Sequence, residues 1–465
     1  MANIKFGTDG WRAIVDKDFN EKNVTLVINA IGKYVFDNFG LKKKIIIGYD
    51  PRNKADEFAK ISAQILCEKG FNVILSEKHV PTPILAFYAK EYNASAIMFT
   101  ASHNPPEYLG IKYIPDYAGP ATTDITEQIV KNIEKEIPNA PNGSIKMQFF
   151  FDEYFKHIQE IVDFNKIKRA NRKIIFDALY SAASGYFDKI LDLKGIKYEV
   201  LHNNRDINFG GGLPEPKPKY LKELIEKVKN TQDTIGLSND GDADRYGVIN
   251  EKGEYVTPNE VMCLLLSHLV KNKKLSGKYV KTVGSSLMHD ILAMKLGIQL
   301  IETPVGFKYV GQAMREKNVI LAGEESGGLS IKGHIPEKDG LLANLLIMDM
   351  LAQTDKYLYE IQEELQEFIG VKFINDRIDI KLDSKEEMKE IIEKFNSDMK
   401  LHELLGIKKI GRKDGIKLYL SDGKSWLLVR PSGTEPLLRI YIETNSEEKM
   451  EQLKKIARNV ATMGG

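Results

Sequence analysis

A serine lies in a polar loop that directly follows a short apolar segment near residue 100. The run "ASAIMF" shows no helical period and is typical of a buried strand, and it leads into "TASHNP", which contains Ser102 and His103. A serine in such a loop can cap a helix, occupy a turn or act as a nucleophile. His103 is the nearest base, but neighbouring side chains of an extended chain point apart, so we expect a poor Ser102–His103 dyad. A phosphorylated Ser102 would avoid that difficulty.

Three aspartates at alternate positions form a second chemical motif. The loop "NDGDADR" contains Asp240, Asp242 and Asp244. In an extended segment these side chains share one face, where their charges repel and a divalent cation with oxygen ligands would relieve the repulsion. The alternative is a solvated acidic turn. A calcium EF-hand loop is excluded, because its sixth position must be glycine and Arg245 stands there.

The aspartate loop therefore predicts a metal site for phosphoryl transfer. Magnesium keeps coordination positions open for phosphate oxygens. A phosphate on Ser102 would bring about −1.5 to −2 charges and would supply the oxygen ligand that three aspartates lack. The chain contains no Walker motif, since "SDGKS" (421–425) lacks the upstream glycine and is better interpreted as a hairpin turn.

Two further loops contain groups that suit a phosphorylated sugar. In "GEESGG" (323–328), Glu324 and Ser326 stand two residues apart and can accept from and donate to the same ligand; an acidic surface turn is the alternative. The last loop, "RPSGTEP" (430–436), combines a guanidinium, two hydroxyls and a tight turn, in Arg430, Ser432, Gly433 and Thr434. Such a set predicts a phosphate cradle, and the alternative is a β-turn with an incidental arginine.

Composition limits the classes of protein that the chain can be. It has 465 residues, which predicts three or four domains, and its 43% apolar and 28% charged residues are ordinary for a soluble protein. The formal net charge of +1 gives no electrostatic case for nucleic acid or membrane binding. We recognise no signal peptide, no membrane span and no cysteine pattern, and we expect a cytoplasmic protein.

The elements that position these loops follow a repeated α/β pattern. Strand-like and helix-like segments alternate in three rounds, and each round ends with an apolar strand that enters a loop of small and acidic residues. After Gly370 the pattern changes to longer strands with flanking helices, which predicts a smaller α+β domain. The expected domains are 1–145 with the Ser102 loop, 146–255 with the metal loop, 256–369 with the sugar loop and 370–465 with the phosphate loop.

The four loops, in this order, resemble the four signatures of the α-D-phosphohexomutase family. "FGTDGWR" near the N-terminus is similar to the opening motif of that family. The resemblance implies an α/β protein of four domains around a central cleft. Three similar domains would have mixed four-stranded sheets, and the C-terminal domain would be a TATA-binding-protein-like α+β fold.

The resemblance also implies a role for each matching residue. Ser102 would be the phosphoserine, and Asp240, Asp242 and Asp244 would bind Mg²⁺ together with its phosphate. Glu324 and Ser326 would hold sugar hydroxyls, and Arg430, Ser432, Gly433 and Thr434 would hold the distal phosphate. Lys112 matches a lysine of proton transfer; Arg12, His103 and Arg245 match polar residues near the phosphoserine; and Lys308 matches a ligand-facing lysine.

The implied reaction interconverts hexose 1-phosphate and hexose 6-phosphate through a sugar 1,6-bisphosphate. "GEESGG" looks more like the third loop of phosphoglucomutases, because phosphoglucosamine mutases usually have a glutamine where Glu325 stands and a histidine where Gly328 stands. We therefore expect glucose phosphate as substrate and glucose 1,6-bisphosphate as activator, with phosphomannomutase or phosphoglucosamine mutase as the alternative. The other classes are a metal-dependent phosphohydrolase and a non-catalytic calcium- or sugar-binding module. We expect a monomer or small homo-oligomer that binds sugar phosphates, not nucleic acid or membranes.

Overall fold

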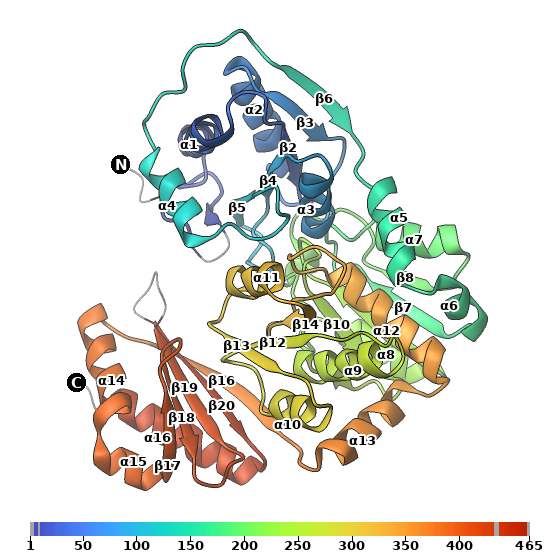
Figure 1. Ribbon diagram of the computed structural model, residues 1–465, viewed down its shortest axis with the longest axis vertical. Helices are drawn as coiled ribbons and strands as arrows, with labels where there is room; N and C mark the ends of the chain where they lie inside the picture. The colour runs from blue at the N-terminus through green and yellow to red at the C-terminus, as the bar shows by residue number, and fades with distance from the viewer. Residues whose placement is uncertain (1–3, 8–9, 432–436, 463–465) are drawn as a thin grey trace. The chain divides into compact units, whose positions relative to one another are not determined.

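The computed structural model describes residues 4–7, 10–431 and 437–462 (Figure 1). The chain divides into two compact units, of which the first comprises Met1–Gly277 and Gly306–Gln362 and the second comprises Lys278–Val305 and Glu363–Gly465. Within the described residues, no helix is both long enough and apolar enough to cross a membrane. The domain boundaries expected after residues 145, 255 and 369 stay predictions.

The N-terminal sheet of the first unit has six strands in the order β1-β5-β4-β2-β3-β6. The strands are β1 (Trp11–Ile14), β2 (Ile45–Tyr49), β3 (Asn72–Ser76), β4 (Ser95–Phe99), β5 (Tyr108–Ile114) and β6 (Ser144–Gln148). The four adjacent strands β4, β2, β3 and β6 run parallel to one another. β5 pairs antiparallel with both β4 and β1, so the sheet is mixed. Its helices are α1 (Glu21–Phe39), α2 (Ala55–Glu68), α3 (Thr82–Glu91) and α4 (Thr123–Lys131).

The next sheet has five strands in the order β11-β10-β9-β7-β8. These are β7 (Lys173–Asp177), β8 (Glu199–Leu201), β9 (Thr234–Asn239), β10 (Tyr246–Ile249) and β11 (Tyr255–Val256). The surrounding helices are α5 (Asp152–Ile161), α6 (Phe164–Ala170), α7 (Phe187–Lys194), η1 (Phe209–Gly211) and α8 (Lys222–Asn230). β7 and β9 are buried and parallel, which explains their continuous apolar sequences.

The third α/β region repeats the same local pattern. β12 (Lys278–Thr282) pairs in parallel with β13 (Leu300–Thr303), and β14 (Val319–Gly323) pairs antiparallel with β15 (Leu329–Ile331). Its helices are α9 (Pro258–Lys271), α10 (Met288–Lys295), α11 (Phe307–Glu316) and α12 (Gly340–Thr354). α12 is apolar nearly all round and is buried along most of its length, as expected of a core helix.

The C-terminal sheet is antiparallel, with the order β16-β20-β19-β18-β17. Its strands are β16 (Ile374–Lys381), β17 (Ile407–Gly411), β18 (Ile416–Leu420), β19 (Trp426–Pro431) and β20 (Leu437–Thr444). The helices of this part are α13 (Leu358–Ile369), α14 (Lys385–Ser397), α15 (Met399–Leu405) and α16 (Glu447–Thr462). The hairpin turn predicted at 421–425 is confirmed, because it joins the antiparallel pair β18 and β19.

Three strands lead into three of the predicted functional loops. β4 ends at Phe99 just before the Ser102 loop, β9 ends at Asn239 just before the aspartate loop, and β14 ends at Gly323, the first residue of "GEESGG". In open α/β sheets, ligands bind outside the carboxyl ends of the strands. The fold therefore presents each loop where such proteins place their ligands.

A buried lysine lies within the second unit. The Nζ of Lys417, which is 1% exposed, donates to the carbonyl of Val283 at 2.6 Å and lies 3.9 Å from the ring centre of Trp426. Burial, reinforced by the charge of Lys281, lowers the pKa of Lys417 to about 7. An unfolded lysine titrates near 10.4, so between about pH 7 and 10 the unfolded chain binds more protons and the folded state gains stability as pH rises.

We therefore expect the stability difference between wild type and Lys417→Met to depend on pH. As pH rises from 7 to 9, the thermal midpoint of wild type should increase relative to that of Lys417→Met, because the penalty for burying the ammonium is relieved. The sequence has two tryptophans, so melting followed by fluorescence in a Trp11→Phe background reports on Trp426 beside the lysine. Midpoints of the two proteins that run parallel over this pH range would contradict the expectation.

Candidate active site

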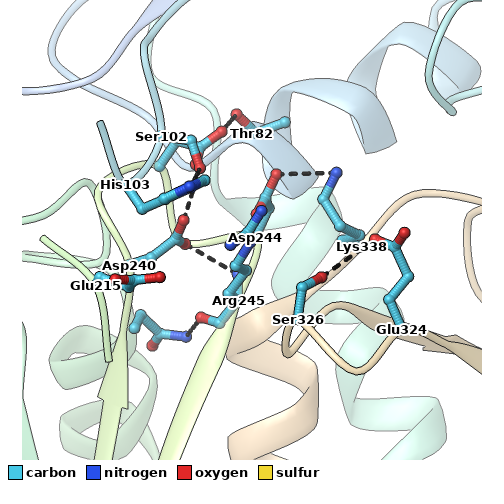
Figure 2. A network of polar contacts seen from close by, with 12 residues as sticks. Thr82, Ser102, His103, Glu215, Asp240, Asp244, Arg245, Glu324, Ser326 and Lys338 are labelled. Carbon is cyan, nitrogen blue, oxygen red and sulfur yellow. Dashed lines mark hydrogen bonds and ion pairs between the residues drawn. The ribbon is translucent and has the colours of Figure 1, made fainter. Parts of the chain in front are cut away.

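Ser102 lies at the centre of a buried polar network. Its side chain is 1% exposed, and its Oγ donates to Asp240 Oδ2 at 2.8 Å (Figure 2). Its Oγ also lies 3.3 Å from Nδ1 of His103. Our expectation that these neighbours point apart is wrong, because Ser102 has a φ of 53° and the chain is not extended there. A non-glycine residue in this left-handed region is strained and needs support from its surroundings.

Arg52 supplies much of that support. Its guanidinium is fully buried, and it donates to the backbone carbonyls of the serine loop: those of Ser102 and Asn104 at 2.6 Å, Pro105 at 2.8 Å and Tyr108 at 3.0 Å. Asp50 holds the other side of the guanidinium, with its Oδ2 3.3 Å from Arg52 Nε.

Asp50 also controls the loop through a hydroxyl. Thr100 Oγ1 donates to Asp50 Oδ2 at 2.6 Å and accepts from the backbone N–H of Ser102 at 2.8 Å. Burial raises the pKa of Asp50 to about 6, although the charge of Arg52 and the hydrogen bonds from Thr100 and the Arg52 backbone oppose the shift. The carboxylate, the guanidinium and the threonine together fix the backbone on both sides of the serine.

The three aspartates converge as predicted, but not because the chain is extended. Asp240, Asp242 and Asp244 are fully buried, and one ligand oxygen from each lies within 4.8 Å of the others. The loop turns at Ala243, whose φ is 60°, and Asp240 N–H donates to the Arg245 carbonyl at 3.3 Å. A tight turn between β9 and β10, rather than strand alternation, therefore gathers the carboxylates.

Cationic and hydroxyl groups surround these carboxylates. Lys112 Nζ lies 2.8 Å from Asp242 Oδ2 and 3.1 Å from Asp244 Oδ2, and Thr82 Oγ1 donates to Asp242 Oδ2 at 2.6 Å. Lys338 Nζ lies 3.2 Å from Asp244 Oδ2. Burial together with the charges of the two other aspartates raises the pKa of Asp240 well above its ordinary range. The three carboxylates therefore disfavour one another's ionisation at this buried position.

These residues fit a divalent cation. Carboxylate oxygens are the ligands that hard cations prefer, and a cation would offset the mutual repulsion. Asp244 Oδ1 is buried and makes no hydrogen bond within the described part of the chain, so it is available as a ligand. The buried triad could therefore bind a metal.

Arg12, His103 and Arg245 lie around the serine, as the resemblance implies. Arg12 Nη1 donates to the side-chain oxygen of Asn104 at 2.7 Å. The charge of Arg245, burial and the charge of Arg12 all lower the pKa of His103, which favours a neutral ring. Burial lowers the pKa of the Arg245 guanidinium, but the negative charges of Asp244 and Asp240 have the larger combined effect, so the pKa is raised.

The third loop forms a second cluster in the first unit. Ser326 Oγ lies 3.5 Å from Glu324 Oε2 (Figure 2). Gly306 N–H donates to Glu324 Oε1 at 2.9 Å. Burial raises the pKa of Glu324 to about 7, and the nearby Lys338 opposes this shift. Lys308 is not part of this cluster in the structure, because its Nζ donates to Thr123 Oγ1 at 3.0 Å at an exposed position.

Arg430 belongs to the second unit. Its Nη2 lies 2.8 Å from Asp414 Oδ2. Ser432, Gly433 and Thr434, which we predicted to complete the phosphate cradle, lie outside the described residues.

Sequence reasoning missed several residues that touch the predicted machinery, among them Arg52, Thr82 and Lys338. Arg52 follows β2, and β2 lies beside β4 in the sheet, so both loops start at the same sheet edge. A search for charged residues after each apolar strand would have found it. Thr82 and Lys338 contact the triad only through tertiary packing, and no local pattern points to them.

Comparison with known proteins places the chain in a family. Models of phosphoglucomutase/phosphomannomutase domains match in order: alpha/beta/alpha domain I at residues 3–140, domain II at 152–253, domain III at 257–368 and the C-terminal domain at 380–460. The chain belongs to the α-D-phosphohexomutase family. It is therefore an intramolecular phosphotransferase that acts on hexose phosphates. Its four-domain α/β architecture with mixed sheets agrees with the predicted fold class, but the first two sheets have six and five strands instead of the expected four, because additional edge strands pair with each.

Individual relatives match over nearly the whole chain. A phosphoglucosamine mutase from Methanococcus vannielii is 30% identical over 96% of this chain and 96% of its own. A phosphoglucosamine/phosphogalactosamine mutase from Sulfurisphaera tokodaii is 31% identical over 97% of this chain and 98% of its own. The crystal structure of a candidate phosphomannomutase from Thermus thermophilus covers 99% of both chains at 28% identity, with a TM-score of 0.87.

The role of Arg52 can be tested by a conservative substitution. In Arg52→Lys, an ammonium replaces the planar guanidinium and cannot reach the same four carbonyls, so Ser102 should lose its strained conformation. We expect kcat to fall about ten- to hundredfold, corresponding to one or two charge-assisted hydrogen bonds, with a smaller change in KM.

The matched control is Arg205→Lys. Arg205 donates to the carbonyls of Pro51 and Arg52, but its side chain is 48% exposed and does not touch the serine loop. Steady-state kinetics on both variants should show a loss only in Arg52→Lys. Equal kcat values for the two would show that the guanidinium does not support the serine.

Proposed function

We propose that this protein interconverts hexose 1-phosphate and hexose 6-phosphate through a phosphorylated Ser102, and that glucosamine phosphate is its preferred substrate. The observation that carries the first part is the buried hydrogen bond of 2.8 Å between Ser102 Oγ and Asp240, inside a cluster of three carboxylates. Burying three carboxylates beside a serine costs free energy, because the carboxylates repel each other and resist ionisation. Phosphoryl transfer at Ser102, which needs a metal site, gives a reason for this arrangement.

Each group of this chain has a part in the proposed reaction. Phosphorylated Ser102 gives its phosphoryl group to a free hydroxyl of the sugar phosphate, and the resulting sugar 1,6-bisphosphate returns its other phosphoryl group to Ser102. Lys112, which pairs with Asp242 and Asp244, takes part in proton transfer from that hydroxyl. Glu324 and Ser326 orient the sugar, and Arg430 binds its distal phosphate. Positioning and neutralisation of charge carry most of such catalysis.

The proposed metal is Mg²⁺, held by Asp240, Asp242 and Asp244 with the phosphate of Ser102. When bound, it would neutralise charge on the phosphoryl oxygens during transfer. The proposed activator is glucose 1,6-bisphosphate or glucosamine 1,6-bisphosphate, either of which can transfer a phosphoryl group to Ser102 directly.

The relatives support an amino sugar more than they support our first expectation of glucose. Of the two relatives described above, one is named phosphoglucosamine mutase and the other phosphoglucosamine/phosphogalactosamine mutase. Glu325, where a glutamine is usual in such enzymes, is compatible with this substrate. A carboxylate accepts a hydrogen bond as an amide oxygen does, and it also attracts an ammonium group. Glucose phosphate remains the second candidate because of the form of the third loop, "GEESGG".

We expect glucosamine 6-phosphate, incubated with the protein, Mg²⁺ and a trace of hexose 1,6-bisphosphate, to yield glucosamine 1-phosphate without release of inorganic phosphate. Ser102→Ala should abolish turnover. The intact mass of the wild type should show a partial increase of about 80 Da that this variant lacks. Stoichiometric release of phosphate would instead indicate a phosphohydrolase, and full mutase activity of Ser102→Ala would exclude the serine as carrier.

Substrate preference gives a separate prediction. We expect kcat/KM for glucosamine phosphate to exceed kcat/KM for glucose and mannose phosphates. Because Glu325 is partly exposed, its attraction for an ammonium should be modest, and Glu325→Gln should lower the glucosamine-to-glucose ratio about two- to fivefold. Measuring all three sugars with both proteins tests this. A ratio that favours glucose in the wild type would replace the proposed substrate without affecting the mutase assignment.

A further inference from the structure

Among the described residues, Arg430 is held by one ion pair. Its side chain is 13% exposed, and its Nη2 pairs with Asp414 Oδ2 at 2.8 Å. Its Nε is buried and donates to no acceptor in the part of the chain that the structure describes. A guanidinium can bind a phosphate through two parallel N–H groups, so an arginine with donors to spare suits such a ligand.

Asp414 lies in the turn between β17 and β18 and is itself fixed. The same oxygen, Oδ2, accepts the backbone N–H of Val305 at 2.9 Å. Both contacts lie within the second unit. The backbone N–H of Val305 therefore fixes the Asp414 carboxylate independently of Arg430, and it compensates part of the carboxylate charge.

The glycine after Asp414 brings this turn against the arginine. Gly415 has a φ of 83°, a conformation that side chains rarely adopt. A Cβ at Gly415 would lie 2.2 Å from the carbonyl oxygen of Val429 and 3.0 Å from Cγ of Arg430. Only a glycine permits this close approach, and the approach is what brings Asp414 within reach of the guanidinium.

We infer that Asp414 is a positioning residue for Arg430 in substrate binding. The inference rests on the proposed function, in which Arg430 binds the distal phosphate. A free arginine loses rotamer freedom when it binds a ligand, and a carboxylate that fixes the guanidinium beforehand reduces that cost. Asp414 engages Nη2 and leaves Nε without an acceptor among the described residues.

The test compares Asp414→Ala, Asp414→Asn, Arg430→Ala and the double variant Asp414→Ala/Arg430→Ala in the full chain. We expect Asp414→Ala to raise KM about tenfold, as for one charge-assisted hydrogen bond, with a smaller effect on kcat. Asp414→Asn should recover part of the loss, because its amide oxygen still accepts. The double variant should be no worse than Arg430→Ala, because a positioning residue has nothing left to position.

Lys413→Met is the matched control for a merely structural role. Lys413 lies in the same turn and its Nζ donates to the Glu302 carbonyl at 2.6 Å, in the same segment that Val305 belongs to. This variant should keep the wild-type KM. Calorimetric binding of glucose 1,6-bisphosphate to all variants provides a readout that does not depend on turnover, and it should weaken in parallel with KM.

Several results would overturn the inference. An unchanged or lower KM in Asp414→Ala, with a raised KM in Arg430→Ala, would remove Asp414 from substrate binding and leave the proposed role of Arg430 intact. Equal effects of Asp414→Ala and Lys413→Met, or additive effects in the double variant, would make the contact structural. If Arg430→Ala itself binds the bisphosphate as wild type does, the proposed phosphate role fails, and the inference fails with it.

Discussion

The burial of three carboxylates within reach of each other is the constraint on which the first unit depends. Asp240, Asp242 and Asp244 have no access to solvent, and like charges in such a place cost far more than at a surface. Lys112 and Lys338 bring positive charge from β5 and from the turn before α12. Because these lysines come from regions far apart in sequence, the acidic loop can exist only if the sheets that supply its partners are assembled around it.

The same constraint explains the scaffold under Ser102. In the proposed function the Ser102 hydroxyl carries a phosphoryl group and faces the triad, and the backbone at Ser102 has a conformation that serine adopts rarely. Arg52, Asp50 and Thr100 hold the loop in that conformation by satisfying its carbonyls and one amide. The loop is thus strained, but several hydrogen bonds from its surroundings hold it in place, and local strain persists at functional sites under this condition.

Sequence patterns predicted the elements well where local rules decide. Apolar runs marked β2, β4, β9 and β14, and the change after Gly370 marked an antiparallel sheet. Patterns failed where tertiary contacts decide. Strand alternation was the wrong reason for the convergence of the aspartates, because a turn at Ala243 gathers them. Extended geometry was the wrong model for Ser102. Thr82 and Lys338 have no local signature, since each acts through a partner more than ninety positions away in the chain.

Exposure to solvent distinguishes Arg52 from Arg430. Arg52 directs its terminal nitrogens at four backbone carbonyls and is wholly buried, so a ligand cannot reach its guanidinium. Arg430 is partly exposed and, within the described part of the chain, its Nη2 pairs with the carboxylate of Asp414. Each arginine pairs with an aspartate, but the first is inaccessible and shapes a loop, whereas the second is partly exposed. Access to the guanidinium, rather than the presence of an arginine, therefore separates a structural guanidinium from one that can recognise phosphate.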